Sequence, residues 1–242
     1  MASGRFRGLA RRVKNKIQGN SNAVGDGFGP SQDAAFAHLD DAADSAFQLI
    51  GASLVSSWEV MLTDVSRAMD PNVPSNLTQE KLREMLERIS DGLVPTQDPV
   101  RNTGKLYRRN LKKGVKHALQ TGKLQDATAP LALSLKELGP EFHAGWTKTT
   151  EYLEPVLALL DSDGSVRAKF ETSGAEMAEM FQKSLQEYNA AQAALPQSSD
   201  LKAAIVIALE TWQQSVSRGL EISIYDCRTA LVNASGRLGA SE

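Results

Sequence analysis

The sequence has little of several features that mark extracellular or membrane-spanning proteins. Its 242 residues include a single cysteine, Cys227, which excludes an internal disulfide and favours a reducing intracellular compartment. The longest unbroken apolar run, Ala203 to Leu209, is far shorter than the roughly eighteen residues of a membrane span. No apolar stretch follows the basic N-terminal residues, so a secretory signal is not expected.

Residue patterns for catalysis or metal binding are also missing. The three histidines, His38, His117 and His143, have no second ligand at metal spacing and indicate surface or helix positions. The sequence contains no nucleophile elbow, phosphate-binding loop or zinc-protease motif. We therefore expect a protein that is not an enzyme and that needs no metal or cofactor. Cys227 is expected to pack in the core, and Trp58, Trp146 and Trp212 are expected to make core or dimer contacts.

No alternating strand pattern occurs, and the apolar residues recur at helical spacing, which predicts an all-α fold. A first helix of more than thirty residues begins near residue 31 and ends before Pro71 and Pro74. Further helical patterns cover residues 76–94, 128–188 and 201–238. Within 128–188, Pro140 and Pro155 should bend the helix, and residues 161–164 are the place where it is most easily interrupted. The seam of the first helix advances by three, four and four residues, at Phe36, Leu39, Ala43, Phe47, Ile50, Leu54, Trp58, Met61, Val65 and Met69.

Acidic residues are absent from residues 1–19, MASGRFRGLARRVKNKIQG, whereas apolar and basic residues alternate there. At helical pitch, one face collects Phe6, Leu9, Val13 and Ile17. The surrounding cations are Arg5, Arg7, Arg11, Arg12, Lys14 and Lys16. A narrow apolar stripe between cations is typical of a helix that lies in the interface of an anionic bilayer.

Three other interpretations of residues 1–19 stay open. The segment has the charge of a basic arm for nucleic acid, the composition of a mitochondrial presequence, and the polarity of a solvated tail. Residues 20–30 are rich in glycine and asparagine and are expected to form a flexible linker.

Acidic residues are missing from a second stretch as well. Residues 101–123 carry eight basic side chains, and the two stretches together leave 13 basic against 29 acidic side chains elsewhere, a balance of −16. A solvated surface normally mixes both signs, so two cationic islands in an acidic body indicate contact with a polyanion.

The order of these features resembles the N-BAR family, and most closely its endophilin branch. A basic amphipathic segment and a linker precede Asp33-x-x-Phe36, which opens the first helix, and an insert rich in proline and basic residues follows at about 95–124. Tyr152-Leu-Glu-Pro155 resembles the family's second helix, and Leu195-Pro196-x-x-x-Asp200 resembles the turn before the third. The resemblance implies a BAR-like domain at 31–240: a long, kinked, antiparallel three-helix bundle that dimerises. The sequence departs from the family at about 183–202, where only Lys183 and Lys202 stand in place of its basic clusters.

The expected function is a cytoplasmic, peripheral homodimer that binds anionic phospholipid membranes and senses or generates curvature, as in endocytosis. Phe6, Leu9, Val13 and Ile17 would insert. The cations that would bind anionic lipid are the six of residues 1–19 together with Lys105, Arg108, Arg109, Lys112, Lys113 and Lys116. The alternative is a helical nucleic-acid-packaging protein, of the coat or nucleoprotein kind, whose two basic islands contact phosphates.

The N-terminal stripe makes a testable prediction. Burying four apolar side chains contributes roughly 6–12 kcal/mol, and ordering about twelve residues costs a comparable amount, so the segment should be helical on anionic vesicles only. Replacing Phe6→Gln with Leu9→Gln keeps the charge and removes the apolar anchor. We expect the double variant to lose tubulation and much of the helicity gained on vesicles, measured by electron microscopy and circular dichroism. Unchanged remodelling would exclude insertion.

Overall fold

The structure is a computed structural model that describes residues 30–69, 77–121, 125–161, 163–194 and 201–238. Chain contacts divide the protein into Met1–His38 and Leu39–Glu242, and the bundle described below belongs to the second unit. The described ranges contain helices and no strand, which confirms the all-α prediction. The helices are α2 (Pro30–Met69), α3 (Gln79–Asp91), α4 (Val94–Thr121), α5 (Gln125–Lys136), α6 (Leu138–Tyr152), α7 (Glu154–Leu160), α8 (Ser165–Ala193) and α9 (Leu201–Leu238).

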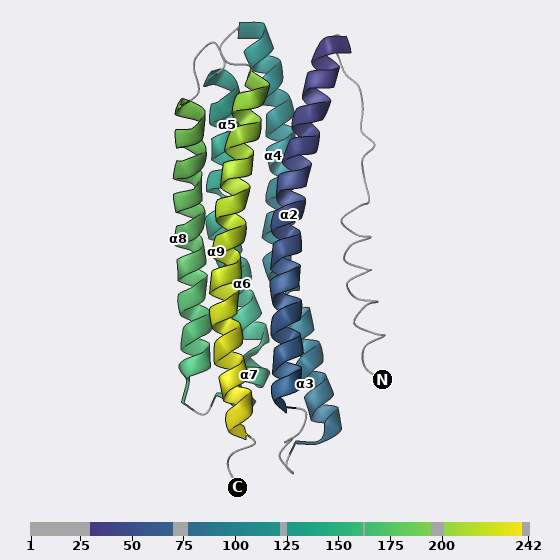
Figure 1. The fold of residues 1–242 in the computed structure, drawn as a ribbon, viewed down its shortest axis with the longest axis vertical. Helices are drawn as coiled ribbons and strands as arrows, with labels where there is room; N and C mark the ends of the chain where they lie inside the picture. Colours follow the sequence, from purple (N-terminus) through teal and green to yellow (C-terminus); the bar gives the residue numbers. More distant parts are fainter. Residues whose placement is uncertain (1–29, 70–76, 122–124, 162, 195–200, 239–242) are drawn as a thin grey trace. The chain divides into compact units, whose positions relative to one another are not determined.

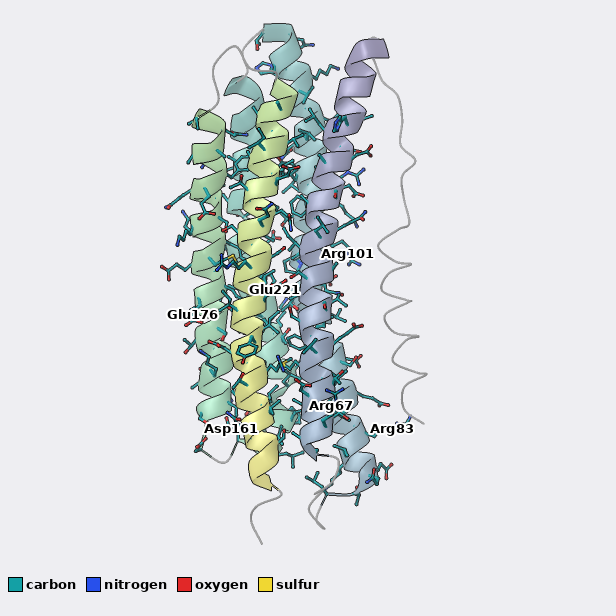
Figure 2. The ribbon with its side chains drawn as sticks, viewed as in Figure 1. Arg67, Arg83, Arg101, Asp161, Glu176 and Glu221 are labelled. Carbon is teal, nitrogen blue, oxygen red and sulfur yellow. The ribbon has the colours of Figure 1, made fainter. Side chains whose placement is uncertain are left out.

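These helices form five rods that lie lengthwise against one another (Figure 1). Only Gly92 and Leu93 separate α3 from α4, and single residues, Glu137 and Leu153, separate α5, α6 and α7. Rod α3–α4 packs on rod α5–α7, which packs on α8, and α8 packs on α9. The ring closes on α2, because Arg108 of α4 and Glu221 of α9 both bind side chains of α2. Figure 2 shows Arg83 and Glu176 at the periphery of the bundle, on α3 and α8.

The apolar seam of α2 is buried within the single chain. From Leu39 onward, every seam position predicted from the sequence is less than a tenth exposed. Trp58 lies at its centre, where its Nε1 donates a hydrogen bond of 2.6 Å to the carbonyl oxygen of Ile89 in α3, and its ring meets that of Trp146 in α6 edge to face. The sequence predicted the seam correctly. The structure covers it with helices of the same chain, so the seam does not require a second copy.

The three tryptophans and Cys227 are core residues, as predicted. Trp146 stacks on Phe170 of α8, and its Nε1 donates to the Phe170 carbonyl oxygen at 2.7 Å. Trp212 of α9 packs on Phe47 of α2. Each ring buries a large apolar area, and the two indole N–H groups named above find carbonyl partners, which is the condition for burying tryptophan without an energetic penalty.

The stretch expected to be an insert is an integral helix. Residues 94–121 form α4, whose inner face includes Val100, Tyr107 and Leu111. Gly104 has a low intrinsic helix propensity, but it allows close packing: a Cβ atom there would lie 3.0 Å from the ring of Phe47. The hydrophobic effect of burying this face outweighs the low helix propensity of glycine.

The weak point at residues 161–164 is a complete reversal of the chain, and it separates α7 from α8. Gly164 has φ of +73°, a left-handed conformation that glycine adopts without strain. The Asp161 carboxylate then accepts hydrogen bonds from the backbone N–H groups of Val166 and Arg167 at 3.0 and 2.9 Å, which caps α8. This reversal, together with α4, replaces the three long helices that the resemblance implied with five rods in the described ranges.

A pair of tyrosine hydroxyls crosses the core between α4 and α8. The Tyr107 and Tyr188 oxygens lie 3.1 Å apart, and Gln192 donates to the Tyr188 oxygen at 2.9 Å. Burial raises the pKa of Tyr188 to about 12 and that of Tyr107 well above its ordinary value. Both hydroxyls therefore stay neutral in the folded protein at a pH where the unfolded chain ionises.

This pair predicts the alkaline limit of stability. Because the folded pKa values are raised, the two neutral hydroxyls contribute fully to the free energy of unfolding below the unfolded pKa of about 10. This contribution is lost as the pH rises toward 12, at about 1.4 kcal/mol per pH unit for each tyrosine. Replacing Tyr107→Phe with Tyr188→Phe removes both partners together and should flatten the fall of melting temperature with pH. The melting temperature is followed by circular dichroism. If it falls equally steeply with pH in the variant, the alkaline loss of stability comes from other groups.

Candidate functional site

The outer face of α4 carries the cations of the second basic stretch. Its inner face holds apolar residues and glycines, and the opposite side holds the basic island predicted from the sequence. The last acidic residue of α4 is Asp98, so nothing on the helix itself neutralises the cations that follow. The next helical turns present Lys105, Arg109, Lys112, Lys113 and Lys116, called here the α4 row.

Helical geometry places the α4 row on one narrow stripe. At 100° per residue the five Cα positions fall within about 100° of arc and extend over about 16 Å of helix. Lys105, Arg109, Lys113 and Lys116 are exposed and Lys112 is half-buried. Leu106, with 40% of its surface exposed, borders the row. The result is a straight cationic ridge with an apolar side chain at its edge.

Arg108 does not belong to this ridge, although it was predicted to bind lipid. Its guanidinium donates two hydrogen bonds of 2.8 and 2.7 Å to the carboxylate of Asp40 in α2 and a third of 2.9 Å to the carboxylate of Asp44. The hydrogen bond with Asp40 raises the pKa of Arg108, although partial burial opposes it. A bidentate, charge-assisted pair of this kind is among the stronger surface contacts. We therefore correct the prediction: Arg108 clamps α4 to α2.

Arg101, which was not among the predicted site residues, is exposed and pairs with Asp98 at 2.5 Å one turn earlier, so its charge is partly compensated. The predicted site residues other than Arg108 divide into two groups. The structure brings Lys105, Arg109, Lys112, Lys113 and Lys116 together. The predicted insertion residues Phe6, Leu9, Val13 and Ile17 and the cations Arg5, Arg7, Arg11, Arg12, Lys14 and Lys16 lie outside the described residues.

The spacing of two aspartates in the sequence is a signal for the clamp. Asp40 and Asp44 stand four residues apart on α2, which places them on one helical face. Arg228 of α9 binds Asp64 of α2 in the same manner, with its Nε 2.8 Å from the carboxylate oxygen. Acidic residues on the flanks of an apolar seam therefore indicated cationic partners on the neighbouring helices.

Other chemistries find no site in the described part of the chain. No group of three or more histidine, cysteine, aspartate or glutamate side chains is placed to hold a metal ion there. Burial raises the pKa of the Cys227 thiol to about 12, and a thiol that stays protonated is unreactive. None of the helices in these ranges combines the length and apolar content of a membrane span.

The α4 row offers no ring for nucleobases. Tyr107, the aromatic residue of the basic island, is fully buried and bonded to Tyr188. Stacking on exposed aromatic rings contributes about 1–3 kcal/mol per base in single-strand-binding proteins. Tyr107 is therefore not available to stack on the bases of a nucleic acid.

Comparison of the chain with protein-family models, with curated proteins and with solved structures finds no match in any of the three. The likeness to N-BAR proteins therefore rests on the short motifs of the sequence.

The structure predicts that substitutions of two adjacent arginines change the stability of the protein by different amounts. Arg108→Gln removes three hydrogen bonds to carboxylates and should cost about 1–3 kcal/mol of stability, toward the lower end because the pair is partly exposed. Arg109→Gln removes the same charge from an exposed side chain and should change stability by less than about 0.5 kcal/mol. Urea denaturation followed by circular dichroism measures both. Equal stability of the two variants would contradict the clamp.

Proposed function

We propose that the protein binds anionic membranes as a peripheral protein of the cytoplasm, and that it senses or generates curvature as a homodimer. The single observation that carries this proposal is the α4 row, a straight stripe of five cations on a helix that has no acidic residue after Asp98 and whose other face is buried in the core. A rigid ridge lies flush against a flat array of headgroups without an entropic cost of ordering its backbone.

The binding free energy that the α4 row can supply is too small for tight binding to a membrane. Each cation near an anionic bilayer contributes on the order of 1 kcal/mol, so five contribute about 5 kcal/mol. That corresponds to a dissociation constant of about 0.1–1 mM. The basic amphipathic segment at residues 1–19 would add apolar insertion to this attraction. Two copies in one particle would raise the effective concentration of both elements.

The homodimer in this proposal would need a surface other than the α2 seam, because the seam is filled by the chain's own helices. Exposed apolar side chains are available on the outer faces of α2 and α9. They are Leu49, Val60, Ile207, Ile222 and Tyr225.

Lysine dominates the α4 row, and this also favours a lipid surface over nucleic acid. Four of the five cations are lysines, whose long flexible stems can reach different headgroups in a fluid layer. The buried position of Tyr107 removes the stacking that a packaging protein for single strands would use.

The test compares two quadruple variants that lose the same charge. The row variant carries Lys105→Gln, Arg109→Gln, Lys113→Gln and Lys116→Gln. The control carries Lys81→Gln, Lys148→Gln, Lys183→Gln and Arg218→Gln, which are exposed cations on α3, α6, α8 and α9. We expect the row variant to lose more than about tenfold in affinity for phosphatidylserine vesicles and the control to lose little, with binding that weakens at higher salt. Co-sedimentation measures this.

The same proteins are titrated with duplex DNA and single-stranded RNA at matched salt. Tighter binding to nucleic acid than to vesicles, lost in the row variant, would replace the membrane proposal with the packaging alternative. Equal vesicle binding by wild type, row variant and control would exclude the row as the contact surface. Comparison of small and large vesicles then reports curvature preference.

A further inference from the structure

The outer face of α2 exposes two large apolar side chains in a stretch without charge. Leu49 and Val60 are 52% and 44% exposed, on a side of the helix that points away from the buried seam. No charged residue occurs from Ser45 to Trp58. The centre of a protein–protein contact is typically depleted of charge and rich in apolar side chains. This face of α2 therefore has the composition of a contact surface.

The residues of this face are spaced symmetrically along the helix. Ala42, Leu49, Val60 and Arg67 follow one another at steps of seven, eleven and seven residues. Steps of this size return to within about 20° of the same side of a helix, so the four residues lie on one line, called here the α2 stripe. The steps read the same in both directions. Two copies related by a two-fold axis need this property, because each residue then meets its counterpart twice.

The symmetry of the α2 stripe defines the register of an antiparallel pair. If Leu49 of one copy lies against Val60 of the other, Arg67 stands seven residues after Val60 and meets Ala42, which stands seven residues before Leu49. Ala42 is adjacent to Asp41, whose side chain is exposed. The pair would therefore have apolar contacts near its centre and opposite charges at both ends, which is the usual anatomy of a specific interface.

Arg67 is available for such a contact. It is the only lysine or arginine of α2, and it lies near the C-terminal end of the helix with its side chain 78% exposed (Figure 2). Its distance of 3.4 Å from Asp64 is long for an ion pair, and Asp64 is bound more closely by Arg228. A carboxylate of a second copy could therefore approach Arg67 from solvent.

The exposed apolar residues of α9 form a less suitable surface. Arg218 lies eleven residues after Ile207 and four before Ile222, on the same side of the helix. Burial of a charge in the middle of an apolar patch is costly without a partner. Tyr225 already has the guanidinium of Arg228 over its ring, 5.3 Å from the ring centre. The α2 stripe therefore fits a second copy better.

The size of the contact indicates its strength. From Asp41 to Arg67, α2 is about 39 Å long, and a helix with its side chains is about 10 Å wide. One helix pair thus covers about 400 Å² per copy, or about 800 Å² in total, which is less than the roughly 1,200 Å² of stable complexes. Such a dimer should be weak and form at high concentration, or where a membrane brings copies together.

We infer that a second copy of the chain docks on the α2 stripe in antiparallel orientation, with Leu49 against Val60 and Arg67 beside Asp41 at both ends. This inference rests on the homodimer of the proposed function and gives it an interface. The Arg108 clamp holds α4 beside α2. A two-fold axis perpendicular to both α2 helices keeps the two α4 helices on one side of the dimer, so both α4 rows would lie on that side.

The first test removes the apolar contacts. The stripe variant carries Leu49→Glu and Val60→Glu. The matched control carries Leu133→Glu and Leu159→Glu on α5 and α7, where the leucines are 59% and 46% exposed. We expect wild type and control to dimerise between micromolar and millimolar concentration, and the stripe variant to lose more than about tenfold in self-association. Sedimentation equilibrium measures this, and unchanged melting temperatures show that both variants fold.

The second test reverses the charges at the ends of the stripe. Arg67→Glu alone and Asp41→Lys alone each bring like charges together at both ends and should weaken self-association by about tenfold. A chain with both substitutions again has opposite charges across the interface and should recover the wild-type affinity. Within one chain the two positions are about 39 Å apart, so recovery cannot come from a contact inside the bundle.

The outcomes separate this interface from the membrane proposal. A wild type that stays monomeric at millimolar concentration would overturn the interface and leave vesicle binding by the α4 row to its own test. Equal self-association of stripe variant and control would also overturn it and assign the homodimer to another surface. Failure of the double charge variant to recover would exclude the antiparallel register. Self-association that depends on the stripe, in a protein that binds no vesicles, would support the interface and overturn the membrane proposal.

Discussion

Burial of the α2 seam within one chain is the constraint on which the rest of the structure depends. Trp58 and its neighbours on the seam need α3, α4, α6 and α9 around them to leave water. That requirement turns the inner face of α4 toward α2 and holds it there with the Arg108 clamp. The cationic side of α4 then has one direction left to face, which is solvent. The α4 row therefore faces solvent because the apolar seam of α2 must be buried against the opposite face of α4.

The α4 helix also shows how net charge along a sequence differs from charge available at a surface. Of the eight basic residues at 101–123, Arg108 is committed to two aspartates and Arg101 to one. Adjacent arginines, 108 and 109, have opposite environments because a helix turns by about 100° per residue. A partner that approaches the protein meets the row and not the whole island.

The apolar periodicity of the sequence was sufficient to predict an all-α fold, the seam of α2 and the helical faces that carry the tryptophans. It was not sufficient to predict how the helices associate, because a seam indicates only that something must cover it and does not indicate which helix does so. Residues 95–124 were expected to be an insert because their prolines and basic residues resemble the insert of N-BAR proteins. Pro95 lies in the first turn of α4, where a missing N–H costs little, Pro99 lies inside the helix, and Gly104 serves close packing. The pairing of Arg108 with Asp40 and Asp44 depends on how α4 is rotated about its axis relative to α2. The residue pattern within either helix does not determine that rotation.

The covered seam has a consequence for how the protein responds to its own abundance. A subunit that hides its core only against a second copy gains stability as its concentration rises and unfolds when it is scarce. A bundle that completes its core with its own five rods has a free energy of unfolding that does not depend on concentration. Assembly, where it occurs, is then separate from folding, so dilution would take copies apart and leave each bundle folded.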